Sequence, residues 1–489
     1  MDDLASVTQA IADSRRACPS SQLRNMAYIS PRDCQALLDM EERLEVARED
    51  CLTRLVAVTK LHSDVVDQLR VVRSALAPIR RLNHDVLAVI FLSIASSYKD
   101  PFESGRFFAR TISRVCFEWY AVCTATPGLW THLALTRGPI CGTPWDHFAK
   151  QVALCGALPI HIRWDLSESL EQLFAFGESV DNPIHSLELN GTWKSVPALC
   201  HPTLAKAERI LLSLSGSRDW DALSVLNVMP NLSHVTIRSD DRYLGLWTEQ
   251  VGSPSLEGLV HLHLDVLQHT PFSVLSRLLI GGSRTLTVLK LSWGVVYPES
   301  PLSLGRFIFL PCLTKLVLAR SACALMLLLQ VPNVSTIRLS DVRRESDAYG
   351  CLLCVLGGLL AASHSGPRVT TLSLAHADPR LVGSVKCVRG CFGLMTNLTN
   401  LTVTDMATES VTTLAGLVAR GMSGAPVVPS LRSASFSHGF HRSPSSVIKA
   451  VRALERDRSA ERLVGGQIVA AIERFHTNMY GDLDMDDEP

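Results

Sequence analysis

Apolar residues recur at seven-residue steps in the stretch from Pro31 to Ala77. The stripe consists of Leu37, Leu44, Cys51, Val58, Val65 and Val72. A second seam, with Leu55, Leu69 and Leu76, is interrupted by Glu41, Arg48 and His62. The spacing predicts one long helix over 31–77 that ends at Pro78. Two roles are open for this helix: packing back onto its own protein, or self-association as a coiled coil.

The segments on either side of this helix differ from it. Residues 1–30 show little periodicity, so we expect a mobile N-terminus. Residues 78–135 predict three short helices rich in large apolar groups, with Asn83 as N-cap of the first and Asp100 before Pro101 at the start of the second. The third contains residues 112–125 and must end before Pro127. So small a unit would be stabilised by a partner that covers one face.

A third pattern, apolar-x-x-apolar-x-apolar, recurs ten times between Ile184 and Phe436. Three consecutive steps between units are each 27 residues long, and Pro or Asn often precedes a unit, as at 331–333. One short strand per unit, followed by a helical or irregular return, would stack into one continuous core. We therefore expect an α/β fold with an irregular solenoid of parallel strands over 136–440. The alternative is an ordinary α/β sheet domain.

The C-terminal part predicts two amphipathic helices, over Ser443–Arg456 and Glu461–Tyr480. We expect them to form a helical cap over 441–480 at the end of the repeats. The final stretch, 481–489, has five acidic residues in nine and predicts a solvated tail.

Composition excludes several classes of protein. Of the 489 residues, 47% are hydrophobic and 19% charged, which provides ample material for a core. Lys+Arg and Asp+Glu both number 47, so no net charge attracts the chain to nucleic acid or to an anionic membrane. The sequence shows no signal peptide, and its longest apolar stretch, near 351–362, is shorter than the ~20 residues that span a bilayer. We expect an intracellular protein of the cytoplasm or nucleus, with neither a membrane nor a nucleic acid as partner.

The 14 cysteines are dispersed, as is usual for free thiols in a reducing compartment. Cys351 and Cys354 form a CxxC, and Cys387 and Cys391 lie four residues apart, but neither pair has the further ligands of a tetrahedral zinc site nearby in the sequence. We interpret these four as core cysteines. His261 and His263 also lack a third ligand, so we expect no metal site.

Catalytic motifs are missing from the sequence: it contains no GxSxG, no GxxxxGK[ST], no HExxH and no GxGxxG after a strand. We therefore expect no enzymatic activity and no cofactor.

Three short motifs within 78–135 occur in the order found in an F-box: LNHDVLAVIF from Leu82, SRVCFEW from Ser113 and TPGLW from Thr126. The segment resembles the F-box-like domains of large fungal families, with Asn83 in place of the usual Pro. The repeats resemble leucine-rich repeats. The resemblance implies that apolar positions dock on the Skp adaptor subunit of a cullin ubiquitin ligase. By motif, these positions are Leu82, Leu87, Ile90, Phe91, Val115, Trp119, Leu129 and Trp130.

The resulting hypothesis is a substrate-recognition adaptor of a Skp–cullin–F-box ubiquitin ligase. The alternative is an interaction scaffold that uses the repeats and the coiled coil without a ligase. Strand residues that alternate with the buried ones would lie on the concave face of the solenoid. There the sequence predicts a mildly basic band of Arg209, His234, Arg238, His261, His263, Lys290, Lys315 and Arg338. The band fits an acidic or phosphorylated segment of a target protein; otherwise these are solvated strand residues.

Overall fold

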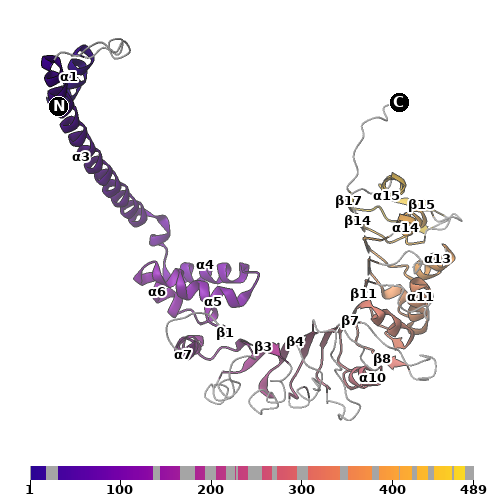
Figure 1. The fold of residues 1–489 in the computed structure, drawn as a ribbon. Coiled ribbons are helices and arrows are strands. Elements are labelled where there is room, and N and C mark those ends of the chain that lie inside the picture. The colour runs from indigo at the N-terminus through magenta and orange to yellow at the C-terminus, as the bar shows by residue number, and fades with distance from the viewer. Residues whose placement is uncertain are drawn as a thin grey trace, which may run out of the picture. The chain divides into compact units, whose positions relative to one another are not determined.

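The long predicted helix is present as α3 (Pro31–Leu76), followed by the 3-10 helix η1 (Pro78–Arg81) (Figure 1). The structure is a computed structural model that describes residues 2–17, 31–135, 144–165, 182–192, 205–215, 226, 229–239, 256–266, 272–293, 307–341, 351–376, 385–406, 408–420, 427–438, 445–464 and 467–479. The predicted acidic tail, 481–489, lies outside the described residues. The chain divides into two compact units, Met1–Leu87 and Ala88–Pro489.

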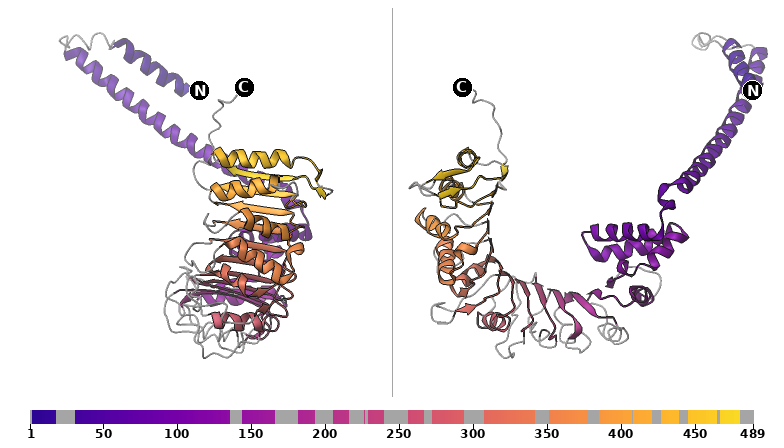
Figure 2. Two further views of the ribbon diagram at one scale, coloured as in Figure 1. Left: turned by 90° about the vertical axis from the view of Figure 1, so that its right-hand side faces the viewer. Right: turned by 180° about the vertical axis from the view of Figure 1, so that it is seen from behind.

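The first unit contains a helix where we expected a mobile segment. Residues Asp2–Ala17 form α1, which packs beside the N-terminal half of α3 (Figure 2). Its side chains make local i,i+4 bonds such as Gln9 Nε2 to Asp13 Oδ1, at 2.9 Å. The expectation of a mobile segment is wrong: Leu4, Val7 and Ile11 have the i, i+3, i+7 spacing of one helical face, which the sequence interpretation missed.

The helical segment after η1 has the predicted caps. It consists of α4 (His84–Ser97), α5 (Pro101–Arg110), η2 (Ile112–Arg114), α6 (Phe117–Thr124) and η3 (Pro127–Leu129). Asn83 Oδ1 accepts a hydrogen bond from the Val86 amide at 2.9 Å, and the Asp100 carboxylate accepts one from the Phe102 amide at 3.0 Å. The single third helix expected over 112–125 is wrong: extended backbone at Cys116 separates η2 from α6.

All ten predicted strand units lie in one parallel sheet. They are β3 (Ile184–Thr192), β4 (Arg209–Ser215), β5 (His234–Ser239), β6 (His261–Val266), β7 (Val288–Trp293), β9 (Lys315–Arg320), β11 (Thr336–Ser340), β12 (Thr371–Ala375), β13 (Asn400–Thr404) and β14 (Ser433–His438). The sheet has 13 strands in the order β1-β2-β3-β4-β5-β6-β7-β9-β11-β12-β13-β14-β17. It extends beyond the predicted range 136–440 through β1 (His132–Leu135) and β17 (Arg474–Met479). Strand β2 (Ile160–Asp165) lies within that range but precedes the ten predicted units.

The helices of the second unit that follow β1 pack against one face of this sheet (Figures 1 and 2). They are α7 (Pro144–Cys155), α10 (Phe272–Gly281), η7 (Ser321–Leu327), α11 (Leu352–Ser363), η9 (Gly366–Arg368), α13 (Val385–Leu394), α14 (Thr408–Arg420) and α15 (Ser445–Asp457). The short strands β8 (Ile308–Phe309) and β10 (Leu329–Gln330) pair in parallel outside the main sheet. The apolar positions of each strand unit, such as Leu316 and Leu318, are buried under this layer and form the core.

The C-terminal cap is only half as predicted. The first expected helix is present as α15, but the second, over 461–480, is wrong. Residues there form an antiparallel pair, β15 (Arg462–Val464) and β16 (Gln467–Val469), and then β17, which pairs in parallel with β14. Without β17, β14 would be the edge strand of the main sheet, with a row of backbone N–H and C=O groups open to pairing. Pairing with β17 satisfies these groups, which favours a strand over a helix in this segment.

Polar side chains link successive repeats at the start of the strands. Asn231 Nδ2 donates to the Ala205 carbonyl at 3.4 Å, and Asn333 Nδ2 to the Pro311 carbonyl at 2.6 Å. Hydroxyls two residues after the Asn position do the same, as from Thr399 to the Thr370 carbonyl at 3.0 Å. The Asn that often precedes a unit in the sequence therefore satisfies a carbonyl of the preceding repeat.

Several strands end at a residue with left-handed backbone. Four residues have φ between 47° and 57° and stand two positions after the last apolar residue of their strand unit: Arg320, Asp341, His376 and Asp405. Their amides continue the ladder, as from Asp341 to the Ala375 carbonyl at 3.1 Å. Asp and His tolerate this conformation better than β-branched residues do, which explains their place in the repeat.

Within the described residues, no helix has both the length and the apolar character needed to cross a membrane.

Candidate binding surface

The helices that follow β1 leave the other face of the sheet open, and this face is referred to below as the helix-free face; among the described helices, only the start of α5 contacts it, at β1 and β2. Residues at alternate strand positions project there, because successive side chains of a strand point to opposite faces. The strand registers align these residues into rows that cross the sheet. One row passes through Arg209, His234, His261 and, two strands later, Lys315.

All eight residues of the predicted band lie on the helix-free face. A second row lies two residues further along the strands. It contains His263 and Lys290 side by side and continues through Val317 to Arg338. Arg238 stands in a third row, opposite Asp265 of the next strand. The alternation of apolar and polar residues was therefore sufficient to place the whole band on one surface.

Four cations on strands β5, β7, β9 and β11 form a cation cluster: Arg238, Lys290, Lys315 and Arg338. Burial lowers the pKa of the Lys290 ammonium, and the positive charges of the other three lower it further. Within the described part of the chain, no carboxylate forms an ion pair with any of the four. Like charges held together without counterions create a local potential that attracts an anion.

The histidines of the band do not add to this charge at neutral pH. Burial, followed by the charges of neighbouring groups, lowers the pKa of His261 to about 4, and burial likewise lowers the pKa of His161, which lies outside the band on β2, to about 4. The pKa values of His234 and His263 are lowered as well, again mainly by burial. The predicted basic band is therefore cationic only through its Arg and Lys members and otherwise presents neutral imidazoles.

Next to these imidazoles the face carries an ion-pair network that sequence reasoning missed. The Arg163 guanidinium lies 2.6 Å from Asp100 Oδ2 and 2.9 Å from Glu188 Oε1, and its Cζ is 4.2 Å from the centroid of the Phe102 ring. Beside Arg163, the rings of His132 and His161 stack on each other, with their centroids 4.4 Å apart and their planes nearly parallel. Strand β2, which supplies Arg163, lacks the leucine pattern of the repeats; only its strict alternation of Ile160, Ile162 and Trp164 could have identified it.

The residues carried over from the F-box motif separate into two groups. Leu87, Phe91, Leu129 and Trp130 are at most 4% exposed, so in this structure they fill the core of the helical segment, and the docking role that the motif implied for them stays a prediction. Phe91 packs edge-on against Trp119, with ring centroids 5.2 Å apart, and Trp130 Nε1 donates to the Cys123 carbonyl at 2.7 Å. Val115 is 48% exposed, while Leu82, Ile90 and Trp119 are half-buried.

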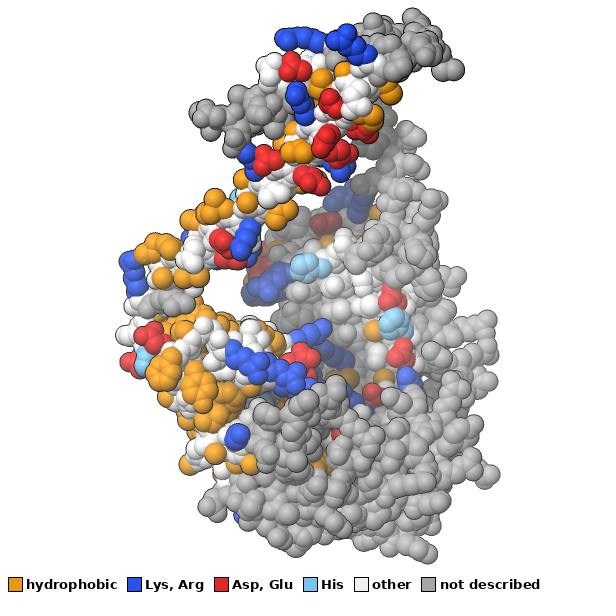
Figure 3. Space-filling model, turned by 60° about the vertical axis from the view of Figure 1, so that its left-hand side comes forward, with side chains coloured by type: hydrophobic (Ala, Val, Ile, Leu, Met, Phe, Trp, Pro, Cys, Tyr) orange, Lys and Arg blue, Asp and Glu red, His pale blue; other side chains and the backbone are white. Residues whose placement is uncertain are grey.

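Other apolar side chains of the helical segment are exposed instead. On α4 these are Val89 and Leu92, and on α6 they are Phe117, which is 82% exposed, and Tyr120. Figure 3 shows hydrophobic side chains gathered on the surface of this segment. Apolar side chains grouped on a surface are typical of a contact with another protein.

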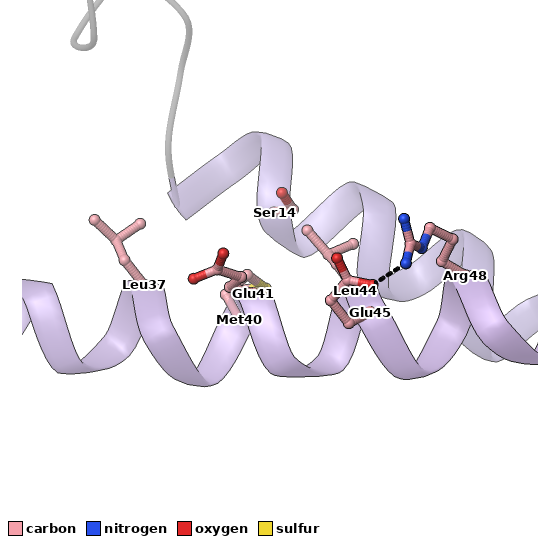
Figure 4. A pocket seen from close by; sticks show the side chains of 7 residues that line it. All are labelled: Ser14, Leu37, Met40, Glu41, Leu44, Glu45 and Arg48. Atoms are coloured by element: carbon pink, nitrogen blue, oxygen red, sulfur yellow. Dashed lines mark ion pairs between the residues drawn. The ribbon is translucent and has the colours of Figure 1, made fainter.

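The heptad seam of α3 is covered over only part of its length. Near its N-terminal end, Leu37, Met40 and Leu44 are half-buried beneath α1 and line a groove with Ser14 of α1 (Figure 4). Further along α3, the side chains of six seam residues are 47–64% exposed: Leu55, Val58, Val65, Leu69, Val72 and Leu76. The N-terminal half of α3 therefore packs back onto its own chain, which is the first of the two roles considered for this helix.

The fold also brings together cysteines that are separate in the sequence. The Sγ atoms of Cys351, Cys354 and Cys387 all lie within 4.8 Å of one another, and they are referred to below as the thiol cluster. The sequence interpretation considered each pair alone and so found no further ligand. The missing signal was the packing of α11 on α13, which spacing along the chain does not encode.

Comparison with known proteins adds no family assignment, since no protein-family model matches the chain and no curated protein has a matching sequence.

Proposed function

We propose that the protein is a non-catalytic substrate-recognition adaptor of a Skp–cullin–F-box type ubiquitin ligase. In this proposal the helical segment over 78–135 docks on the Skp subunit, and the helix-free face holds an acidic or phosphorylated segment of a target protein. The observation that carries the proposal is the cation cluster on an open strand surface of a chain whose net charge is zero.

The target side of the proposal rests on charge and shape. The cation cluster crosses five consecutive strands of the main sheet, from β5 through β6 to β11, so one extended peptide lying across the strands reaches all four side chains. Neighbouring strands are about 4.8 Å apart, so the four intervals span about 19 Å, the length of five or six extended residues. Arg238 and Arg338 supply planar donor groups that bind carboxylate or phosphate in a bidentate manner, and the two lysines add point charges.

The docking side rests on the exposed apolar side chains of α4 and α6. The helical segment has a small core around Phe91, Phe108 and Trp119 and leaves Phe117 and Tyr120 exposed. Removing such side chains from water on docking contributes about 1.5–3 kcal/mol for each one that is fully buried. The residues that support docking are thus mostly neighbours of those that the motif named.

Affinity capture from a cell lysate, with the full chain as bait, tests both sides of the proposal. The target variant reverses three cations, as Lys290→Glu, Lys315→Glu and Arg338→Glu. Its control reverses three exposed cations on the helical elements, as Lys150→Glu, Arg368→Glu and Lys449→Glu, with the same change in net charge. We expect the target variant alone to lose a set of captured proteins while retaining the Skp subunit.

The docking variant is Phe117→Asp, with Phe309→Asp as its control, because Phe309 is also exposed, at 53%, but lies on β8. We expect only Phe117→Asp to lose the Skp subunit. Phe91→Asp is unsuitable because it would place a charge in the core. Failure of the unmodified chain to capture a Skp subunit would refute the adaptor function, and equal capture by both charge-reversal variants would refute the role of the cation cluster.

An assembly scaffold without a ligase is the second candidate. The exposed seam of α3 from Leu55 to Leu76 favours it, because two such helices would bury these side chains against each other. In the capture experiment a scaffold retains proteins that depend on the cation cluster but never the Skp subunit.

A further inference from the structure

The thiol cluster lies at the N-terminal ends of two packed helices. Cys351 is the N-cap of α11, and its Sγ accepts a hydrogen bond from the Cys354 amide at 3.4 Å. Cys387 is the third residue of α13. Both helices therefore direct the positive ends of their dipoles to the region of these three sulfurs.

Close packing of α11 on α13 fixes the two ends next to each other. A Cβ atom at Gly357 of α11 would lie 3.8 Å from the Cα and Cβ atoms of Cys391, so the two helices meet at van der Waals distance there. Cys391 follows Cys387 by one helical turn and is 2% exposed. The contact that holds the helices together is thus one turn from the sulfurs, which makes the spacing of the thiol cluster a property of the packed fold.

The arrangement has the size of a metal site. Zn²⁺ binds thiolates at about 2.3 Å in a tetrahedron, which places the sulfurs about 3.8 Å apart. Sulfurs that all lie within 4.8 Å of one another reach that distance by rotation of their side chains. Cys354 is exposed and the other two are half-buried, so an ion can enter from solvent.

The charge balance of the site fits the same role. Three thiolates and the positive ends of two helices balance the charge of a divalent ion.

We propose that Cys351, Cys354 and Cys387 form a binding site for a thiophilic metal ion of the Zn²⁺ class. On binding, each thiol loses its proton to solvent and forms a sulfur–metal bond, with no change in oxidation state. The ion links the first turns of α11 and α13 and so joins two neighbouring repeats. A disulfide would use only two of the three sulfurs, whereas a metal ion uses all three.

Cobalt binding to the reduced full-length chain tests this site, because thiolate-bound Co²⁺ shows a charge-transfer absorption that Zn²⁺ abolishes by displacement. We expect the absorption to saturate at one Co²⁺ per chain, to be lost in Cys354→Ser and in Cys387→Ser, and to be unchanged in the control Cys312→Ser, whose thiol is exposed elsewhere. An absorption that persists in both cluster variants would overturn the proposal, as would none in the unmodified chain.

A second measurement avoids variants that fold poorly. In the unmodified chain, Zn²⁺ should slow the alkylation of Cys354 by iodoacetamide at least tenfold and leave that of Cys312 unchanged, as read by peptide mass spectrometry. Equal alkylation rates of Cys354 with and without Zn²⁺ would exclude the site, and so would a disulfide within the thiol cluster that persists in the freshly purified chain and prevents Co²⁺ binding.

Discussion

Arg458 is the buried cation whose removal should most disturb the C-terminal repeats. It follows α15 directly, its side chain is 1% exposed, and its guanidinium donates six hydrogen bonds of 3.2–3.4 Å to five backbone carbonyls. The carbonyls belong to Val418 at the end of α14, to Val428, Pro429 and Leu431 before β14, and to Ala470 before β17. One side chain therefore connects three segments that meet only in the folded state.

The perturbation is Arg458→Met, which has a similar length but no donors. The carbonyls of Val428 and Pro429 keep backbone donors, the Leu431 amide at 3.5 Å and the Ala470 amide at 2.8 Å, so the loss falls on the other three carbonyls. Leaving a buried carbonyl without its partner costs about 1–3 kcal/mol, so three carbonyls cost about 5 kcal/mol. Burying the methionine side chain offsets about 2 kcal/mol of this cost. We expect a net loss of about 3 kcal/mol in the C-terminal repeats. The matched control is Arg452→Met, at an exposed position of the same helix, and it should change stability by less than about 0.5 kcal/mol.

Hydrogen exchange is the suitable assay, because stacked repeats open locally and a single unfolding free energy does not describe them. A loss of about 3 kcal/mol corresponds to exchange that is faster by about a hundredfold. The acceleration should appear in β14 and β17 and be absent from β4 to β7. Unchanged protection of β14 and β17 in Arg458→Met would show that these carbonyls do not depend on the guanidinium.

Two further predictions follow from burial and from close packing. The folded-state pKa of His161 is lowered to about 4, below its ordinary value of 6.5, so its contribution to stability is complete above pH 6.5 and declines as the pH falls towards 4. The urea midpoint should therefore be lower at pH 5 than at pH 7.5, and less so in His161→Gln; an equal fall in both chains would contradict this role. Gly366→Ala should lower the thermal midpoint, since a Cβ there would lie 2.5 Å from the Leu394 carbonyl oxygen, whereas Gly390→Ala, with no atom within 4 Å, should raise it slightly. Equal midpoints in these two variants would refute the packing argument.

Local chemistry in the sequence determined many of the elements. The heptad spacing predicted α3, the side chains of Asn83 and Asp100 predicted two helix starts, and the repeated apolar units predicted ten strands. Period-two alternation also placed the whole cationic band on one face, including Lys290 and Arg338. These predictions succeed because each depends on residues only a few positions apart.

Tertiary structure decided what depends on partners distant in the sequence. The stretch 461–480 has an amphipathic helical pattern, but pairing with β14 makes part of it the strand β17. Phe91 and Trp130 occupy motif positions for docking, yet their contacts with α5 and α6 place them in the core. Cys387 joins Cys351 and Cys354 only because α11 packs on α13. Sequence periodicity states which side of an element is apolar, whereas only the packed chain determines which element covers that side.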